Sequence, residues 1–356
     1  MEDVILLDVL KVFGLAIFSF FVAFLVTPLL THYLYTYKMW RPNVARKATT
    51  GEHASVISGI LKKRTRVDTP RMGGILIWGT TVFVAIFLWL LSQIYDNALF
   101  SKLTFLSRNQ TWLPFIALIA GSLTGLLDDW MAVRGRDTYV GGGLDLKARI
   151  GAVLVIGAVG AWWFYSQLEM RGIYIPFLGD LTLGIFFIPF FMFTMLAVFA
   201  GGVIDGLDGL AGGVFASIIA AYAGIAFFQN QLDLAAFLSV IGGALLAFLW
   251  YNIPPARFYM GETGMLGLTS MLTVVAFLTG AVAVLPIIAF PLVVEVASNI
   301  IQLSSKYFRG KKVFLAAPIH HHFEAIGWPH YKVTMRFWIV SVVCAIMGMV
   351  IHIIGK

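Results

Sequence analysis

Residues 264–303 form a run of forty residues with a single charged side chain, Glu295. A helix needs about 20 mostly apolar residues to cross the hydrocarbon core of a membrane, so this run is long enough for two crossings. A helix exposed to water needs a polar face, which this run does not supply. The sequence therefore predicts two membrane helices here, joined by a tight turn near Thr279 and Gly280.

Similar apolar runs recur along the chain. We expect ten membrane spans, at residues 13–36, 73–95, 113–131, 148–165, 181–200, 210–228, 234–253, 264–280, 282–304 and 334–354. Hydrophobic residues make up 60% of the chain and charged residues 12%, whereas a soluble domain has roughly 25% charged residues. These proportions exclude a soluble globular protein, a disordered chain and a disulfide-rich secreted module. The predicted fold is an all-α, polytopic integral membrane protein with a single domain over residues 1–356.

Basic residues are concentrated in every second loop. With ten spans, the loops 37–72, 132–147, 201–209, 254–263 and 305–333 share one side of the membrane. These loops and the adjoining helix ends hold all 25 Lys and Arg residues except Lys11, Lys102, Arg108, Arg171 and Lys356. The positive-inside rule places these loops in the cytoplasm, so we expect both termini on the outer side of the membrane.

The same charge pattern bears on partners and processing. The basic residues lie in short loops between helices and form no separate basic domain, so we expect no nucleic-acid partner. The first residues, Met1-Glu-Asp, lack a basic segment, so we expect no cleaved signal peptide. The chain has one cysteine, which excludes an intramolecular disulfide.

An aspartate pair, Asp128-Asp129, ends the third predicted span. Adjacent carboxylates repel each other, and at a membrane surface they are costly unless a cation or protons compensate. A divalent metal is the simplest compensation, and Mg²⁺ prefers such hard oxygen ligands. A solvated helix end is the alternative interpretation.

Two more loops carry carboxylates on the same side. In Asp205-Gly-Leu-Asp208, one helical turn would place both aspartates on one face, and the glycine permits close approach of a ligand. Alternatively, Asp208 caps the next helix. Glu262 lies where the eighth span begins, at a helix N-terminus that favours anions, including phosphates. Glu262 either caps that helix or carries a metal that meets a phosphate.

Three consecutive histidines, His320-His321-His322, lie between the last two predicted spans. They cannot share one face of a helix, and they could be hydrogen-bond donors to phosphate, acid/base groups or metal ligands. Zinc is the less favoured metal because no thiol or spaced histidine pair accompanies them. A polar loop without function is the alternative.

Glu295 is an acid inside a predicted span, which makes it a functional candidate by default. The alternative is a hydrogen bond to a neighbouring helix. Pro286 and Pro291 are expected to kink this span.

Together these motifs resemble the polyprenyl-phosphate hexosamine-1-phosphate transferases, and within that superfamily the phospho-N-acetylmuramoyl-pentapeptide transferases (translocase I of peptidoglycan synthesis). The resemblance extends from Thr69-Pro-Arg-Met-Gly-Gly to Arg336-Phe-Trp. The aspartate pair and Asp205-Gly-Leu-Asp-Gly are shared across the superfamily, whereas Pro318-Ile-His-His-His-Phe-Glu is similar to the muramoyl-pentapeptide branch.

The resemblance implies a reaction and its participants. Undecaprenyl phosphate would attack the β-phosphate of UDP-N-acetylmuramoyl-pentapeptide, giving lipid I and UMP at the bacterial cytoplasmic (inner) membrane. Mg²⁺ is the implied cofactor and a homodimer the implied assembly. Cell wall biogenesis and cell shape would depend on this step.

The resemblance also implies roles for residues. Glu262 matches the metal-binding position, and Asp128 and Asp129 match the catalytic pair, with Asp128 a second candidate for metal contact. The histidine motif adds His320, His321 and His322 to the catalytic candidates. Candidate substrate-binding residues are Arg66, Lys147, Arg149, Asp205, Gly206, Leu207, Asp208, Asn252 and Tyr259.

The chain departs from the family pattern at three points. Arg71 stands where the family has Thr, Glu262 stands in place of Asp, and no Asn precedes Asp205.

The sequence leaves two alternative functions open. The first is the same chemistry on UDP-N-acetylglucosamine, against which the triple histidine argues. The second is a secondary transporter, which predicts paired charges in mid-membrane and inverted repeats. The acids instead gather at one membrane surface.

Overall fold

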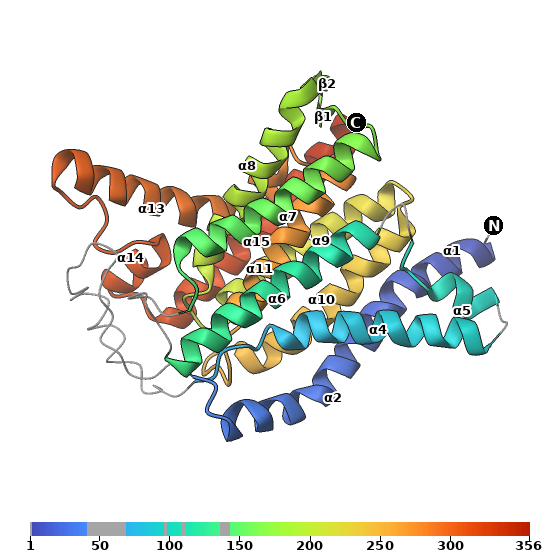
Figure 1. The fold of residues 1–356 in the computed structure, drawn as a ribbon, viewed down its shortest axis with the longest axis horizontal. Coiled ribbons are helices and arrows are strands. Elements are labelled where there is room, and N and C mark those ends of the chain that lie inside the picture. The colour runs from blue at the N-terminus through green and yellow to red at the C-terminus, as the bar shows by residue number, and fades with distance from the viewer. Residues whose placement is uncertain (1, 41–68, 96–97, 108–110, 136–142) are drawn as a thin grey trace.

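The computed structural model describes residues 2–40, 69–95, 98–107, 111–135 and 143–356. Within these residues the chain is almost entirely helical (Figure 1). The first half contains α1 (Glu2–Val9), a π-helical turn η1 (Leu10–Gly14), α2 (Leu15–Thr36), α4 (Ile75–Ile94), α5 (Ala98–Leu103), α6 (Trp112–Arg134) and α7 (Leu146–Ser166). A hairpin of β1 (Gly172–Ile175) and β2 (Gly179–Thr182) follows, which the sequence did not predict.

The second half begins with the short η2 (Gly184–Phe186), α8 (Phe187–Ala200) and η3 (Gly201–Ile204). It continues with α9 (Leu210–Phe228), α10 (Leu232–Asn252), α11 (Gly261–Leu278), α12 (Leu285–Ile288), α13 (Phe290–Arg309), α14 (Ile319–Ala325) and α15 (His330–Gly355). The expected turn near Thr279 and Gly280 is confirmed, since α11 ends at Leu278 and Gly280 has a φ of 65°.

Nine helical segments of the described chain are long and apolar enough to cross a membrane, which confirms an all-α, multi-pass membrane protein. The predicted span 282–304 is not among them. There the helix is interrupted at Ala289 between α12 and α13, and Pro286 and Pro291 lie in the first turns of these two helices. The structure therefore has a break between two helices where kinks within one helix were predicted, and α13 carries buried polar residues that make it less apolar than the other spans.

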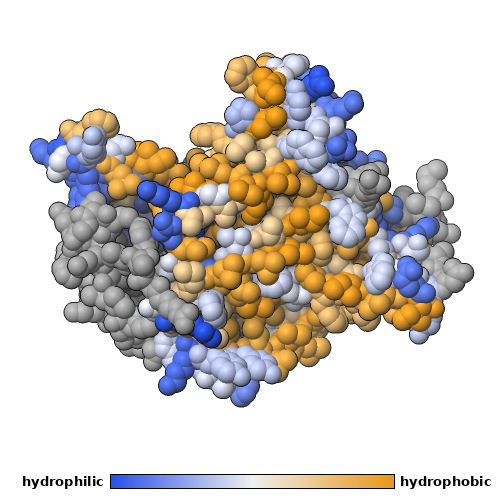
Figure 2. All heavy atoms as spheres, in the orientation of Figure 1, coloured by the Kyte–Doolittle hydropathy of each residue, from blue (hydrophilic) through white to orange (hydrophobic). Residues whose placement is uncertain are grey.

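The helix α11 lies at the centre of the bundle, where α6, α8, α4, α7 and α9 pack around it. Nearly all of its residues are buried, whereas α2 and α15 expose much of their apolar surface. Figure 2 shows apolar side chains over the middle of the bundle and hydrophilic residues toward its extremities. This distribution is the one that a bilayer requires of helices that face lipid.

Two glycines let α6 approach α11 backbone to backbone. A Cβ atom at Gly121 would lie 2.8 Å from the carbonyl carbon of Leu266, and one at Gly125 would lie 2.6 Å from the amide nitrogen of Thr263. Both distances are shorter than real Cβ contacts, so only glycine fits. Small residues four apart are a common device for close packing of membrane helices. Here they bring the end of α6 to the start of α11.

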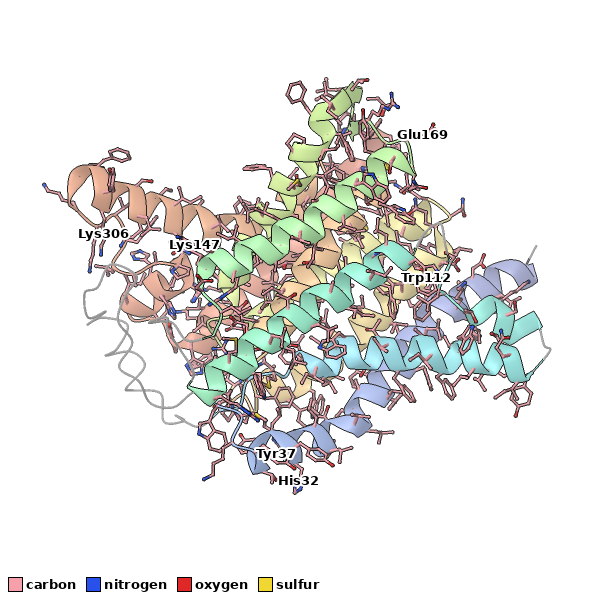
Figure 3. All side chains as sticks on the ribbon, in the orientation of Figure 1. His32, Tyr37, Trp112, Lys147, Glu169 and Lys306 are labelled. Carbon is pink, nitrogen blue, oxygen red and sulfur yellow. The ribbon has the colours of Figure 1, made fainter. Side chains whose placement is uncertain are left out.

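The chain termini lie at one end of the bundle. Gln229, in the turn after α9, donates a hydrogen bond to the carbonyl of Thr279 at 2.9 Å and contacts the Nε2 atom of His352 at 3.0 Å. The hydroxyl of Tyr174, on the hairpin, donates to the carbonyl of Gly355. Figure 3 shows Trp112 and Glu169 toward this end and Lys147 and Lys306 toward the other.

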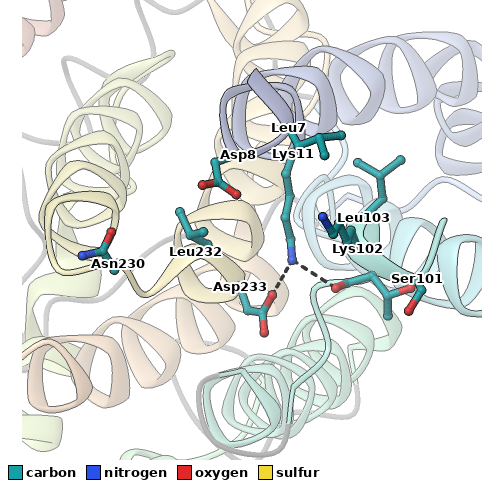
Figure 4. Close-up of a pocket in the computed structure, with 10 residues that line it drawn as sticks. Leu7, Asp8, Lys11, Ser101, Lys102, Leu103, Asn230, Leu232 and Asp233 are labelled. Atoms are coloured by element: carbon teal, nitrogen blue, oxygen red, sulfur yellow. Dashed lines mark hydrogen bonds and ion pairs between the residues drawn. The ribbon is translucent and has the colours of Figure 1, made fainter. Parts of the chain in front are cut away.

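The same end holds a pocket of about 520 Å³ between η1, α5 and the start of α10 (Figure 4). The ammonium group of Lys11 forms an ion pair with Asp233 and donates to the carbonyl of Thr104 at 3.2 Å. This contact joins η1 to the first turn of α10. A charge this poorly exposed requires a partner, so the pair anchors the N-terminal segment to the bundle.

Candidate active site

The aspartate pair is fully buried at the end of α6. Asp128 and Asp129 are 1% and 0% exposed. An Oδ1 atom of Asp128 accepts a hydrogen bond from the amide of Leu144 at 2.7 Å. Asp129 accepts one from the amide of Thr263 at 3.0 Å and one from Nε of Arg71 at 3.0 Å. The two carboxylates are thus held by different segments, and the interpretation as a solvated helix end is wrong.

A second arginine joins this pair to the start of α11. Asp145 is the N-cap of α7, where its side chain accepts a hydrogen bond from the amide of Ala148 at 2.8 Å. This cap sets the start of α7 and places Arg149 one turn further on. Nε of Arg149 is 3.2 Å from Asp128, and Nη1 is 2.9 Å from Glu262. The guanidinium therefore bridges the two residues predicted to contact a metal.

Glu262 is the second residue of α11 and does not occupy its cap position. That position belongs to Met260, which makes no side-chain cap hydrogen bond. The side chain of Glu262 is instead directed to Arg149 and is 24% exposed. The structure therefore disfavours the helix-cap alternative and leaves the metal-binding prediction open.

Asp205 follows η3 and reaches the same place. Its Oδ2 atom accepts a hydrogen bond from the amide of Gly261 at 3.1 Å. Burial raises the pKa of Asp205 to about 6, although Arg71 acts in the opposite direction. Burial alone would lower the pKa of Arg71, but the surrounding carboxylates, above all Asp129, raise it, so this guanidinium stays charged.

The residues Asp208 and Asn252 tie two loops together. Asp208 accepts a hydrogen bond from the amide of Ala256 at 3.1 Å. The side chain of Asn252 accepts from the amide of Gly209 at 3.0 Å and donates to the carbonyl of Phe258 at 2.8 Å. Gly209, with a φ of 75°, is the N-cap of α9, so the prediction that Asp208 caps this helix is wrong. The loops 205–209 and 253–260 consequently form one unit.

The loop 69–74 completes the cluster. The amide of Tyr259 donates to the carbonyl of Pro70 at 2.8 Å, and the amide of Gly73 donates to the carbonyl of Tyr259 at 2.8 Å. These strand-like contacts position Arg71 beside Asp129. Tyr259 itself is half-buried.

The three histidines lie on α14 and have three different partners. Nδ1 of His320 is 2.8 Å from Oε2 of Glu295, and Nδ1 of His321 is 2.8 Å from Oε2 of Glu324. Nδ1 of His322 accepts a hydrogen bond from the amide of Leu315 at 3.3 Å. The prediction that they do not share one face is confirmed.

Among the described residues, His320 packs against a loop that carries carboxylates. A Cβ atom at Gly206 would lie 2.9 Å from Cε1 of His320, so the imidazole packs directly on the backbone of loop 205–208. Leu207, in the same loop, is buried at 2% exposure and supports the loop as an apolar side chain.

The remaining candidates are less constrained. Lys147 is exposed in the first turn of α7, near Arg149 (Figure 3). Arg66 lies outside the described residues. Arg71 was not among the residues predicted from the sequence, although its basic side chain at a position where the family has Thr was a usable signal.

The donor set fits Mg²⁺ in chemistry and charge. Asp128, Asp129, Asp205 and Glu262 carry four negative charges when ionised, and Arg71 and Arg149 carry two positive ones, which leaves a net charge of 4 − 2 = 2 negative units. A divalent cation would balance this charge. The described residues contain no group of three or more His, Cys, Asp or Glu side chains that could hold a metal ion by themselves. Mg²⁺ commonly takes one or two carboxylates and completes its shell with waters and substrate phosphates.

Comparison with known proteins places this geometry in context. Residues 111–280, which contain the aspartate pair and Glu262, match Glycosyl transferase family 4. The chain is 32% identical over 329 residues to the phospho-N-acetylmuramoyl-pentapeptide-transferase of Chloroflexus aggregans, which covers 88% of this chain and 85% of that protein. It is 34% identical over 303 residues to the protein of the same name from Bartonella quintana, with 80% of each chain covered. The corresponding protein of Pelagibacter ubique is 34% identical over 306 residues, again with 80% of each chain covered.

Proposed function

Because the chain belongs to glycosyl transferase family 4, whose members transfer glycosyl 1-phosphates, we propose that it makes lipid I. In this proposal undecaprenyl phosphate attacks the β-phosphate of UDP-N-acetylmuramoyl-pentapeptide, and UMP leaves. The relatives named for this reaction and the motif His320-His321-His322 support the muramoyl-pentapeptide donor over UDP-N-acetylglucosamine.

The observation that carries the proposal is the position of the charged cluster. Four carboxylates and two guanidiniums meet at one end of an apolar helical bundle. A water-soluble nucleotide sugar and a membrane-bound lipid phosphate can meet only at such a boundary. A transporter would instead hold its charges near the middle of the bundle.

The residues of the cluster have different roles in the proposed reaction. Arg71 and Arg149 supply guanidinium donors, which suit phosphate oxygens. Asp129, with bonds to Arg71 and the amide of Thr263, orients Arg71 toward the cluster. Asp128 takes the proton of the lipid phosphate as the nucleophile forms.

Glu262 would hold Mg²⁺, and Asp128 is the alternative ligand if it does not act as the base. Bound Mg²⁺ would neutralise charge on the leaving phosphate. Asp205, Asp208 and Asn252 shape the loops that surround the nucleoside, and Tyr259 supplies an aromatic face for uracil. We infer further that the cluster faces the cytoplasm, that both termini lie outside, and that the enzyme is a homodimer.

A single assay tests the proposal. Purified protein in detergent is incubated with Mg²⁺, undecaprenyl phosphate and one of the two UDP-sugars, and released UMP is measured. We expect rapid release with UDP-N-acetylmuramoyl-pentapeptide and little with UDP-N-acetylglucosamine. A reaction without lipid phosphate is the control for simple hydrolysis. A preference for UDP-N-acetylglucosamine would refute the assignment of the donor, and UMP release without the lipid would refute the transfer.

A further inference from the structure

Glu295 is a buried carboxylate without a role in the proposed function. It lies in the second turn of α13, with an exposed fraction of 0%. Its Oε2 atom is 2.8 Å from Nδ1 of His320, which belongs to α14 and is likewise 0% exposed. A buried carboxylate is costly unless it is paired, and this pairing is with a histidine of the three-residue motif.

The pair has two polar atoms that are not used within the described chain. Nε2 of His320 and Oε1 of Glu295 are both buried without a hydrogen-bond partner. Folded proteins rarely leave such atoms unsatisfied, because each one loses its hydrogen bonds to water. An unsatisfied atom in a native structure therefore indicates a ligand, a water or a catalytic role.

The position of the ring shows what Nε2 can reach. A Cβ atom at Gly206 would overlap Nε2 and lie 2.9 Å from Cε1, so the nitrogen faces the backbone of loop 205–208. Asp205, in that loop, is hydrogen-bonded to Gly261 at the start of α11. The free nitrogen is thus directed at the edge of the carboxylate and guanidinium cluster.

A structural tie between α13 and the following segment would look different. Gln302, two turns along α13, accepts hydrogen bonds from the amides of Val313 and Phe314 and donates one to the carbonyl of Phe314. Ser305 donates to the carbonyl of Lys311. These side chains already fasten the segment, and each of their polar atoms has a hydrogen-bond partner. The pair of Glu295 and His320 is not needed for that purpose.

A carboxylate at one ring nitrogen fixes both the rotation of an imidazole and its tautomer. Nδ1 then carries a proton toward Glu295, and Nε2 is left for another partner. When an imidazole carries a proton on both nitrogens, its Nε2 atom is a donor, and such a donor suits an anionic oxygen.

We propose that Glu295 is a positioning residue, which holds His320 so that its Nε2 atom binds an oxygen of the donor substrate's diphosphate beside loop 205–208. This inference rests on the proposed function, because it requires a diphosphate in the cluster. Glu295 itself touches no substrate.

A double-mutant cycle tests the proposal. The kinetics of UMP release from UDP-N-acetylmuramoyl-pentapeptide are measured for Glu295→Gln, for His320→Ala and for the double variant. We expect Glu295→Gln to lower kcat and kcat/KM together, by about 10- to 100-fold, the usual effect of losing a residue that orients a functional histidine. In the His320→Ala background the same change should have no further effect, because Glu295 acts only through that ring.

The matched control is Ser298→Ala, on the same helix. Ser298 is also buried, but its hydroxyl donates its hydrogen bond to the main-chain carbonyl of Glu295 and not to the carboxylate that holds His320. Its kcat should stay within about two-fold of the wild type, as for a loss confined to stability. Folding of every variant is checked by its thermal midpoint. If Glu295→Gln does not fold, Glu295→Asp, which keeps the charge, takes its place in the cycle.

The outcomes separate the two proposals. If the wild-type protein releases no UMP from any UDP-sugar, the proposed function is wrong and the inference falls with it. If the wild type is active but the losses in the two single variants add up in the double variant, the inference alone is wrong. Wild-type kinetics in the folded Glu295→Gln variant would also refute it.

Discussion

The contact between α6 and α11 can be tested by adding one methyl group. In Gly125→Ala the new Cβ would overlap the carbonyl group of Glu262 and lie 2.6 Å from the amide nitrogen of Thr263. Both obstacles are main-chain atoms inside a helix, so neither can rotate away. The two helices must separate instead.

The size of the effect follows from this distance. Carbon atoms and their neighbours pack at about 3.5–4.0 Å, so α6 and α11 would move apart by roughly 1 Å. Overpacking of this kind costs about 1–3 kcal/mol of stability. The movement also stretches the 3.0 Å hydrogen bond between Asp129 and the amide of Thr263, and it shifts the aspartate pair away from Glu262. A displacement of about 1 Å near reacting groups can lower a rate by about 10²-fold.

Two measurements check this prediction, the thermal midpoint in detergent and kcat for UMP release at a temperature where the variant is folded. Gly79→Ala, in α4, is the matched control, since a Cβ there would make only an ordinary contact of 3.8 Å with Ile75. It should leave both quantities near those of the wild type. Unchanged stability and kcat in Gly125→Ala would show that the close packing of α6 on α11 does not set the geometry of the cluster.

Three further predictions concern charges. Glu262→Gln should lose most Mg²⁺-dependent UMP release, because a neutral amide is a far weaker ligand, whereas Glu262→Asp should retain measurable activity; a normal Mg²⁺ titration in Glu262→Gln would contradict the metal assignment. The folded-state pKa of Asp205, about 6, lies above the ordinary 3.8, so Asp205 holds its proton more tightly in the folded protein. Its contribution to stability is therefore present below pH 4 and is lost as the pH rises through about 6. As the pH rises between these values, the thermal midpoint of the wild type should therefore fall relative to that of Asp205→Asn. If the two midpoints change in parallel with pH, the raised pKa of Asp205 is refuted. Lys11→Met should lower the free energy of unfolding by about 1–3 kcal/mol, because it removes the charged partner of Asp233. The kcat per folded molecule should not change, because Lys11 lies at the other end of the bundle from the charged cluster.

The sequence predicted the nine candidate membrane helices of the described residues because their signal is local, and it expected a tenth span at 282–304 that is not among them. Each span needs only an apolar run of sufficient length, and the turn at Thr279 and Gly280 follows from the same reasoning. The hairpin at residues 172–182 was missed, since its short strands adjoin an apolar run that continues into α8. The break at Ala289 was anticipated only as a kink, because two prolines signal a bend but not how the helix resumes.

The charged cluster was predictable in its members but not in its pairings. The carboxylates could be placed on one side of the membrane from loop order alone. Their partners could not, because Arg71 and Asp129 are separated by 58 positions, and Arg149 and Glu262 by 113. From the sequence, a metal was therefore the expected compensation for Asp128 and Asp129, whereas the structure places two guanidiniums beside them.

Two departures from the family pattern meet in this cluster. A threonine at position 71 would leave four carboxylates against the single guanidinium of Arg149, a net charge of 4 − 1 = 3 negative units when all are ionised. Arg71 lowers this excess to two, and it does so through Asp129, the carboxylate with no exposure to water. Glu262 keeps the charge of an aspartate and adds a methylene, with which it pairs with Nη1 of Arg149. With both departures present and all four carboxylates ionised, one divalent cation would be sufficient to neutralise the cluster, and the diphosphate of the proposed nucleotide-sugar donor would then approach without net repulsion from it.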